Sequence, residues 1–156
     1  MPTADNPNKA SDQRIQLVIQ SRLDAVPLLA RLVEAVCQSA GISPSDRDLI
    51  GLCIVEAVNN SILHAYHEDP GQTVHVEVRI YKEKIIFELT DRGESADPVT
   101  MNADHRSVFG GEIISEAAES GRGLAIMQEV MDSVEYSTSP GSNRLRLVKS
   151  FQNQNV

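Results

Sequence analysis

Hydrophobic and polar residues alternate in five short stretches of the chain. Each stretch has the period of two that is typical of a strand with one buried face. A short polar connection separates the second stretch from the third and predicts a β-hairpin, and a Pro-Gly turn joins the fourth to the fifth. The predicted strands are at residues 15–19, 74–80, 85–89, 133–139 and 144–151.

Between these strands, hydrophobic residues recur with the spacing of amphipathic helices. Ser21 is the expected N-cap of the first helix. The second helix begins with Ser43 as N-cap and Pro44 at its first position, and it runs to about Tyr66. The predicted apolar face of the first helix consists of Leu28, Leu29, Leu32, Val33 and Val36. A third helix carries Leu124, Ile126, Met127, Val130 and Met131.

The order of these elements predicts an α+β fold. The strands are grouped instead of alternating strictly with helices, which favours helices that cover one face of a mixed β-sheet. Residues 13–152 are expected to form this single domain, whereas residues 1–12 lack apolar periodicity and are expected to form a frayed tail. The irregular stretch 94–120 is longer than an ordinary connection in a compact domain, which makes it a candidate lid.

Length and charge narrow the functional classes. The chain has 156 residues and a formal net charge of −8, and an acidic surface repels nucleic acid and anionic membranes. No apolar run reaches the roughly 20 residues of a membrane span, and the N-terminus lacks the features of a signal peptide, so we expect a cytoplasmic protein. Cys37 and Cys53 lie within apolar helical patterns and are expected to be packing thiols.

A single carboxylate stands in the most hydrophobic helix. Glu56 is the only charged residue between positions 49 and 63. Asn60 and His64 follow it at intervals of four residues, so the three side chains share one helix face. In one interpretation, Glu56 is solvated at the helix surface or pairs with an arginine. In the other, the stripe lines a ligand cavity, with Glu56 as a general base and Asn60 as a ligand of a hard cation such as Mg²⁺.

Glycines concentrate between the predicted hairpin and the third helix, where they favour close backbone approach or motion. Asp91 ends a strand shortly before Gly93, and its carboxylate either belongs to an ordinary turn or accepts hydrogen bonds from a ligand amino group. Gly121-Arg122-Gly123-Leu124 is expected to open the third helix and to offer free N–H groups to a phosphate.

Taken in order, three motifs of the chain resemble the nucleotide-binding boxes of a known family. They are Glu56-Ala57-Val58-Asn59-Asn60, Asp91-Arg92-Gly93 and Gly121-Arg122-Gly123-Leu124. The sequence has no P-loop or Rossmann motif. From about Arg14 onward it is similar to the anti-sigma-factor serine kinases of the histidine-kinase-like (GHKL) ATPases. The resemblance implies a two-layer α/β sandwich, the Bergerat-type ATP-binding fold, with ATP between the helices and the lid.

The resemblance also implies roles for the first two motifs. Glu56 would be the general base toward an attacking serine hydroxyl, and Asn60 would ligate the Mg²⁺ that bridges the phosphates. Asp91 would read the adenine amino group, and Gly93 would allow close approach.

The third motif and two arginines would serve the phosphates. Gly121 and Gly123, followed by Leu124, would let the lid and the helix N-terminus meet them. Arg106 and Arg122 are the candidate arginines for neutralising phosphate charge.

The implied activity is ATP-dependent phosphorylation of a serine on a small anti-sigma-factor antagonist, a STAS-domain protein. The same surface region would hold a sigma factor inactive, and the chain would form a homodimer. One alternative is a sequestration module that binds nucleotide and partners without phosphoryl transfer. Another is a soluble α+β domain that binds no nucleotide.

The sequence departs from the family pattern at two positions. Ser95 replaces the second glycine of the second box, which predicts a stiffer hinge for the lid. Asn143-Arg144 occupies the turn where many relatives carry Gly-Thr, whose threonine supports adenine binding.

Overall fold

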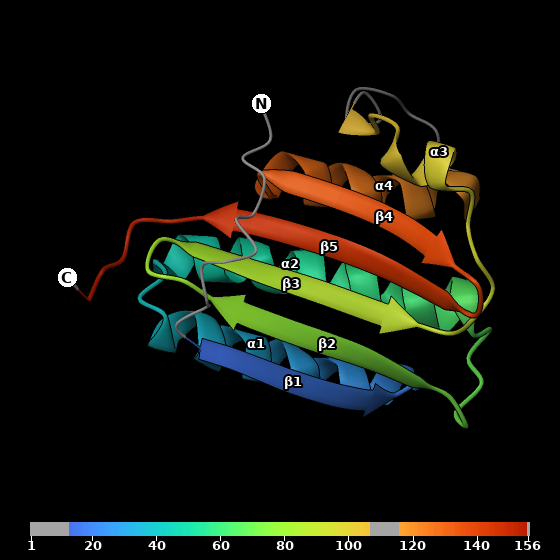
Figure 1. Cartoon of the computed structure of the whole chain (residues 1–156), viewed down its shortest axis with the longest axis horizontal. Coiled ribbons are helices and arrows are strands. Elements are labelled where there is room, and N and C mark those ends of the chain that lie inside the picture. The colour runs from blue at the N-terminus through green and yellow to red at the C-terminus, as the bar shows by residue number, and fades with distance from the viewer. Residues whose placement is uncertain (1–12, 107–115, 156) are drawn as a thin grey trace.

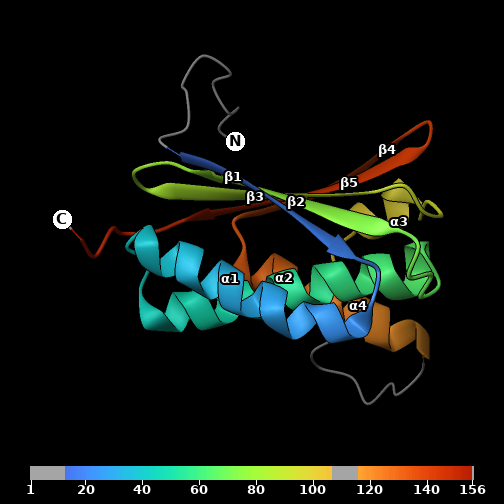
Figure 2. The same cartoon turned by 90° about the horizontal axis from the view of Figure 1, so that it is seen from below.

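The chain folds into two layers, a five-stranded sheet and a layer of helices on one of its faces (Figures 1 and 2). The computed structural model describes residues 13–106 and 116–155. The helices are α1 (Val26–Ser39), α2 (Pro44–Asn60), α3 (Pro98–Asn102) and α4 (Glu116–Val130). Figure 2 shows α1, α2 and α4 beneath the sheet, whereas the short α3 packs beside β4. The predicted α+β architecture with two layers is confirmed, and within the described residues no helix combines the length and hydrophobicity of a bilayer span.

The sheet is antiparallel throughout its described length, so the prediction of a mixed sheet is wrong. Its strand order is β1-β2-β3-β5-β4, and each neighbouring pair runs antiparallel. The crossover through α4 makes β3 and β4 run in the same direction, but β5 inserts between them and removes the parallel pair. The strands are β1 (Gln13–Gln20), β2 (Thr73–Ile80), β3 (Lys84–Asp91), β4 (Ser133–Ser139) and β5 (Ser142–Ser150).

The hydrophobic core lies between the sheet and the helices. The alternating residues of the β2–β3 hairpin are buried as the pattern predicted, and Phe87 is among the largest side chains with no exposed surface. Cys37 and Cys53 are also fully buried, and burial raises the pKa of both thiols to about 12. They are therefore packing residues, as expected, because a protonated and enclosed thiol is a poor nucleophile.

The first helix does not begin as predicted. Ser21 does not cap it: a 3₁₀ turn over Leu23–Ala25 intervenes, and the N-cap position of α1 is Ala25. Ser21 is instead fully buried, and its backbone N–H donates to the carbonyl of Gln72 at 2.9 Å. The extra turn thus moves the helix start beyond the reach of the Ser21 hydroxyl.

The buried face of α1 is narrower than predicted and rotated from it. Leu28 and Leu32 are 63% and 40% exposed, so their assignment to the core-facing side is wrong. Only one stripe of a helix can face the sheet, and residues at intervals of three and four fill it. The stripe consists of Val26, Leu29, Val33 and Cys37.

The second helix begins as predicted and ends in an irregular turn. Ser43 is its N-cap, and the hydroxyl accepts a hydrogen bond from the N–H of Asp46 at 3.4 Å. The chain then continues through a π-helical turn, Ser61–Ala65, in which the N–H of Tyr66 donates to the carbonyl of Ser61 at 3.0 Å. The helical segment therefore reaches Tyr66, as expected, with its last turn widened.

The third predicted helix, α4, begins at Glu116, so the prediction that Gly121 opens it is wrong. The preceding Glu-Ala-Ala-Glu run consists of strong helix formers, and the helix passes through the glycines. The amides of Gly121 and Gly123 therefore lie inside the helix and not at its free N-terminus. Residues 107–115 of the expected lid lie outside the described residues.

The first part of the expected lid, residues 94–106, is tied to β4 and α4. The side chain of Asn102 donates to the Tyr136 carbonyl and accepts from the Tyr136 N–H, each at 2.8 Å. Gln128 of α4 donates to the carbonyl of Ala103 at 2.7 Å. Side-chain amides thus hold this part of the segment, in which Met101 also packs against the hydrophobic core.

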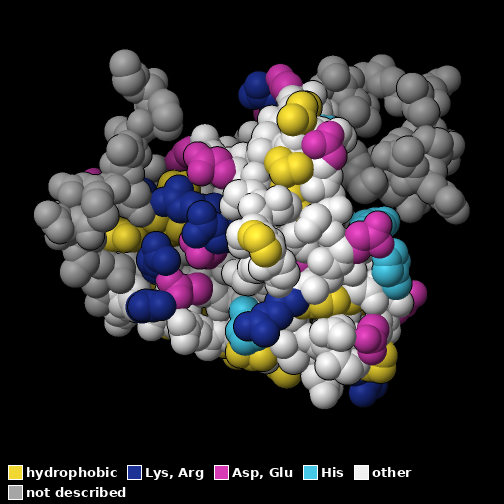
Figure 3. Space-filling view, turned by 45° about the vertical axis from the view of Figure 1, so that its right-hand side comes forward, with side chains coloured by type: hydrophobic (Ala, Val, Ile, Leu, Met, Phe, Trp, Pro, Cys, Tyr) yellow, Lys and Arg dark blue, Asp and Glu magenta, His cyan; other side chains and the backbone are white. Residues whose placement is uncertain are grey.

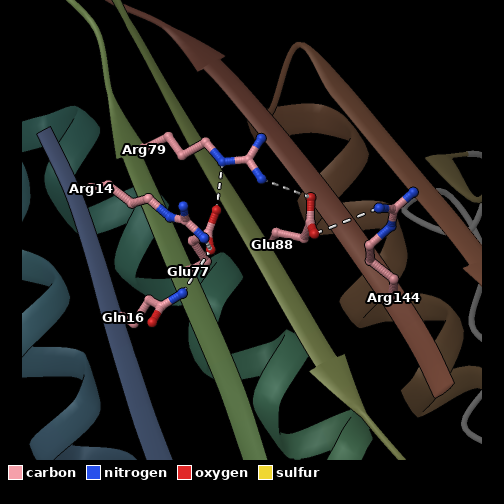
Figure 4. A network of polar contacts seen from close by, with 6 residues as sticks. All are labelled: Arg14, Gln16, Glu77, Arg79, Glu88 and Arg144. Atoms are coloured by element: carbon pink, nitrogen blue, oxygen red, sulfur yellow. Dashed lines mark hydrogen bonds and ion pairs between the residues drawn. The ribbon is translucent and has the colours of Figure 1, made fainter. Parts of the chain in front are cut away.

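The face of the sheet opposite the helices carries a network of charged residues, and basic and acidic side chains gather on this part of the surface (Figures 3 and 4). Glu77 accepts from Arg79 at 2.5 Å, from Arg14 at 2.6 Å and from Gln16 at 3.1 Å. Burial alone would raise the pKa of Glu77, but these hydrogen bonds outweigh it and lower the pKa to about 2. The ionised carboxylate therefore stabilises the fold.

Glu77→Gln should lower the free energy of unfolding at pH 7 by about 1–2 kcal/mol. Because the pKa of Glu77 in the folded chain lies below that of an unfolded glutamate, this contribution is present above about pH 4.5 and is lost as the pH falls toward 2. Urea unfolding of both proteins between pH 7 and pH 3 measures the difference, with Glu34→Gln on the exposed surface of α1 as control. A difference that stays constant over this range would contradict the assignment.

Candidate functional site

A cavity of about 300 Å³ lies where the end of α2 meets the ends of β3 and β5. This volume is at the lower limit of small-molecule sites. Its wall is mostly apolar, with a few polar groups that converge on it. The lining residues are Ala57, Asn60, Ser61, His64, Ala65, Leu89, Asp91, Glu94, Ser95, Ala96, Met101, Leu124, Tyr136 and Leu145.

Asp91 is the buried charge of this cavity. It is the last residue of β3 and is only 8% exposed. Its Oδ2 accepts from the hydroxyl of Ser61 at 2.8 Å, and its Oδ1 accepts from the side chain of Asn143 at 2.7 Å and from the N–H of Gly93 at 3.1 Å. A carboxylate has about four acceptor positions, so these three donors leave one position, on Oδ2. The geometry supports the interpretation of Asp91 as an acceptor for a ligand amino group.

Gly93 allows the chain after β3 to approach the π-helical turn. A Cβ at this position would lie 2.3 Å from the carbonyl oxygen of Ala65, which is closer than any side chain tolerates. The next residue, Glu94, donates its N–H to the same carbonyl at 2.8 Å. The group that Gly93 approaches is the backbone of Ala65, and the expected close approach of a ligand at Gly93 stays a prediction.

The polar stripe of α2 divides between the cavity and the neighbouring helix. Asn60 and His64 line the cavity, but Glu56 lies outside its lining and packs against α4. A Cβ at Gly123 would lie 2.9 Å from Oε2 of Glu56, so the glycine leaves the room that the carboxylate occupies. Leu124, the residue after it, lines the cavity and is 4% exposed.

The structure does not bring the two candidate arginines to the cavity wall. Arg106 forms a bidentate pair with Asp104, at 3.0 Å for each contact, and these hydrogen bonds lower the pKa of Asp104 to about 2. Arg122 lies exposed on α4. Gly121 is in the same helix, and its surroundings lie outside the described part of the structure.

Sequence reasoning missed several polar residues of the site. Ser61 and Tyr136 were not predicted, and Asn143 and Ser95 were noted only as departures from a family pattern. The hydroxyl of Tyr136 accepts from the N–H of Ala96 at 3.0 Å, and burial raises the pKa of Tyr136. Ser61 directly follows Asn60, which is the one signal that could have identified it. Ser95 lies two residues after the Asp91-Arg92-Gly93 motif, whereas Tyr136 and Asn143 lie far from the motifs in the sequence and reach them only through the pairing of strands in the sheet.

The cavity and its surroundings can hold a ligand with an apolar ring system and an amino group. The apolar wall suits a flat ring, and Asp91 offers the remaining acceptor for the amino group. Within the described residues, the lining includes no lysine or arginine, so the wall itself supplies no cation for a phosphate.

Comparisons with known proteins assign the chain to a family. Residues 19–149 match the family model described as histidine kinase-like ATPase domain. The serine-protein kinase RsbW of Halalkalibacterium halodurans is 25% identical over 129 residues, which cover 83% of this chain and 78% of that protein. RsbW of Bacillus subtilis is 21% identical over 127 residues, which cover 81% and 79%.

Two solved structures share the fold. The RsbU and RsbW domains of a Mycobacterium tuberculosis protein match with a TM-score of 0.62 and 15% identity, covering 88% of this chain and 32% of that chain, so this chain spans about a third of its length. The SiaB–SiaC complex of Pseudomonas aeruginosa matches with a TM-score of 0.61 and 12% identity, covering 86% and 88%. The family match extends over most of the chain and includes every residue that lines the cavity. The chain therefore belongs to the histidine kinase-like ATPase domain family.

Proposed function

We propose that this chain is an ATP-dependent protein serine kinase that also acts as an anti-sigma factor. The observation that carries the proposal is Asp91, a buried carboxylate with one acceptor position left in a cavity of mostly apolar wall. Such a site suits the amino group and the ring of adenine. The similarity to RsbW proteins, which are named serine-protein kinases, supports the choice of reaction.

Asn60 fits a role in binding Mg²⁺. Its side chain lines the cavity and carries an amide oxygen, a ligand type that hard cations accept. The described residues contain no cluster of three or more His, Cys, Asp or Glu side chains that could hold a metal, so Asn60 would share the ion with the phosphates of ATP. When bound, Mg²⁺ supplies positive charge that the described lining lacks.

Glu56 fits the role of general base. It lies one helical turn before Asn60 on the same face of α2, next to the cavity and not within its lining. There its carboxylate would accept the proton of a serine hydroxyl as the serine oxygen bonds to the γ-phosphorus and ADP departs. Gly123 keeps the space beside α4 open for the carboxylate.

The proposed substrate is a serine of an anti-sigma-factor antagonist with a STAS domain, and the proposed regulatory target is a sigma factor. We also propose that the chain acts as a homodimer in the cytoplasm, with residues 94–120 as a lid over ATP.

The alternative function is a sequestration module without phosphoryl transfer, which differs from the kinase in requiring no function for Glu56. Transfer of radiolabelled γ-phosphate to a purified STAS-domain antagonist, together with calorimetry of ATP binding with and without Mg²⁺, tests both. Absence of Mg²⁺-dependent ATP binding would contradict the kinase proposal.

Glu56→Gln should bind ATP as the wild type does and lose phosphoryl transfer by roughly 10²–10⁴-fold, because the amide cannot accept the hydroxyl proton. Single-turnover transfer at saturating Mg²⁺-ATP measures the chemical step. Glu129→Gln, at an exposed position of α4, is the matched control and should transfer at the wild-type rate. Unchanged transfer in Glu56→Gln would show that another group is the general base, whereas absence of transfer in the wild type as well would favour the sequestration module.

Asn60→Ala should weaken binding of Mg²⁺-ATP by about tenfold or more and change binding of metal-free ATP much less, because it removes a ligand of the ion. The adjacent Asn59, which does not line the cavity, provides the control Asn59→Ala. Titration calorimetry in Mg²⁺ and in EDTA gives both affinities. Equal losses under the two conditions would argue against a ligand role for Asn60.

Gly123→Ala should slow phosphoryl transfer by about 10–100-fold while the chain stays folded, because the added Cβ displaces the Glu56 carboxylate from its place beside α4. Gly51→Ala in α2 is the matched control, since nothing lies within 4 Å of its Cβ position. Rates at saturating ATP and the affinity for ATP are measured for both. A weaker affinity for ATP with an unchanged rate of transfer at saturating ATP would show that Gly123 acts in phosphate binding and not in placing the general base Glu56.

A further inference from the structure

Two of the residues at which the sequence departs from the family pattern, Ser95 and Asn143, are hydrogen-bonded to each other beside Asp91. The hydroxyl of Ser95 donates to Oδ1 of Asn143 at 2.6 Å, and Nδ2 of Asn143 donates to Oδ1 of Asp91 at 2.7 Å. We propose that Asn143, held by Ser95, is a positioning residue that fixes the Asp91 carboxylate so that the site selects a 6-amino purine over a 6-oxo purine. The inference rests on the proposed function, because it assigns the selectivity of the same site.

Strand pairing places Asn143 where it can act on Asp91. The two residues are direct partners in the β3–β5 register, at the end of β3 next to the cavity. Asn143 is 2% exposed, so its side-chain amide is shielded from water and needs partners in the protein. On its other side Asn143 is the register partner of Thr138 in β4, across the β4–β5 turn in which Gly141 has a φ of 75°.

The hydrogen bonds allow one orientation of the Asn143 amide. Its Nδ2 faces three oxygens, Oδ1 of Asp91 and the carbonyls of Gly93 at 3.1 Å and Glu94 at 3.4 Å, whereas its Oδ1 faces the hydroxyl of Ser95. A flipped amide would set its oxygen against these acceptors. The acceptors around Nδ2 therefore set the orientation in which Asn143 donates to Asp91, and the hydrogen bond from Ser95 holds the amide in this place.

The orientation of the Asp91 carboxylate matters because both classes of purine carry a hydrogen-bond donor on the ring edge formed by N1 and position 6. A 6-amino purine donates from its amino group, and a 6-oxo purine has a carbonyl there with an N1–H beside it. A carboxylate that can rotate would accept from either donor. On Asp91, Oδ1 is filled by Asn143 and Gly93, and only Oδ2 has a position left, next to the Ser61 hydroxyl. With this geometry fixed, the carbonyl of a 6-oxo purine would meet an acceptor.

The test compares the affinities of Mg²⁺-ATP and Mg²⁺-ITP, whose bases differ in the amino and carbonyl groups at position 6. The wild type should bind ATP at least about 10²-fold more tightly than ITP. Asn143→Ala should reduce this ratio by about tenfold, and Ser95→Ala by about threefold, because the serine acts through the asparagine. Ser139→Ala, an exposed serine of β4, is the matched control for Ser95→Ala and should keep the wild-type ratio.

The double variant separates positioning from a general loss of structure. If Ser95 acts through Asn143, the variant with both substitutions should show the same ATP-to-ITP ratio as Asn143→Ala alone. Thermal unfolding shows that each variant is folded, and the Ser95→Ala change, at a residue on the surface, provides a result even where Asn143→Ala destabilises the chain.

Three results would overturn the inference, and they point to different causes. If the wild type binds neither triphosphate, the proposed function fails together with the inference. If the wild type prefers ATP and the variants keep its affinities for both ATP and ITP, only the role of Asn143 and Ser95 fails. If Asn143→Ala weakens ATP and ITP equally, Asn143 supports the fold and does not set base selectivity.

Discussion

The site depends on one constraint, which is that the buried charge of Asp91 must be satisfied by hydrogen bonds. Its donors come from three parts of the chain: Ser61 lies in the π-helical turn, Asn143 lies in β5, and Gly93, two residues after Asp91, donates its backbone N–H. These donors can converge only when the end of α2 and the β3–β5 pair are correctly placed. The fold and the acceptor position left for a ligand are thus fixed by the same contacts.

The two layers divide the remaining tasks. The helical layer places Glu56 and Asn60 along one face of α2, and α4 approaches this face closely because Gly123 has no side chain. The sheet supplies the end of β3 and the partner strand β5, and its opposite face carries the charged network around Glu77. In the proposed kinase, the ends of strands therefore recognise adenine, whereas a helix carries the residues for metal binding and proton transfer.

Periodicity predicted most of the fold, because burial of one face sets the period of each element. The β2–β3 hairpin and the Ser43 cap follow from local sequence and are confirmed. Features that depend on tertiary neighbours were not predictable: β5 inserting beside β3 made the sheet antiparallel, and packing of α1 left Leu28 exposed. At the site, the motifs indicated Asp91, but its bond to Asn143 depends on strand register. Arg106 does not line the cavity and pairs instead with Asp104, two residues away.

The central claim is that Asp91 receives the amino group of adenine in the cavity at the ends of α2, β3 and β5. The most direct measurement is a crystal structure of the chain with Mg²⁺ and a non-hydrolysable ATP analogue. The account predicts the adenine amino nitrogen at hydrogen-bond distance, about 2.7–3.2 Å, from Oδ2 of Asp91, with Asn143 still on Oδ1. An analogue bound outside this cavity, or bound within it with its amino group away from Asp91, would contradict the account.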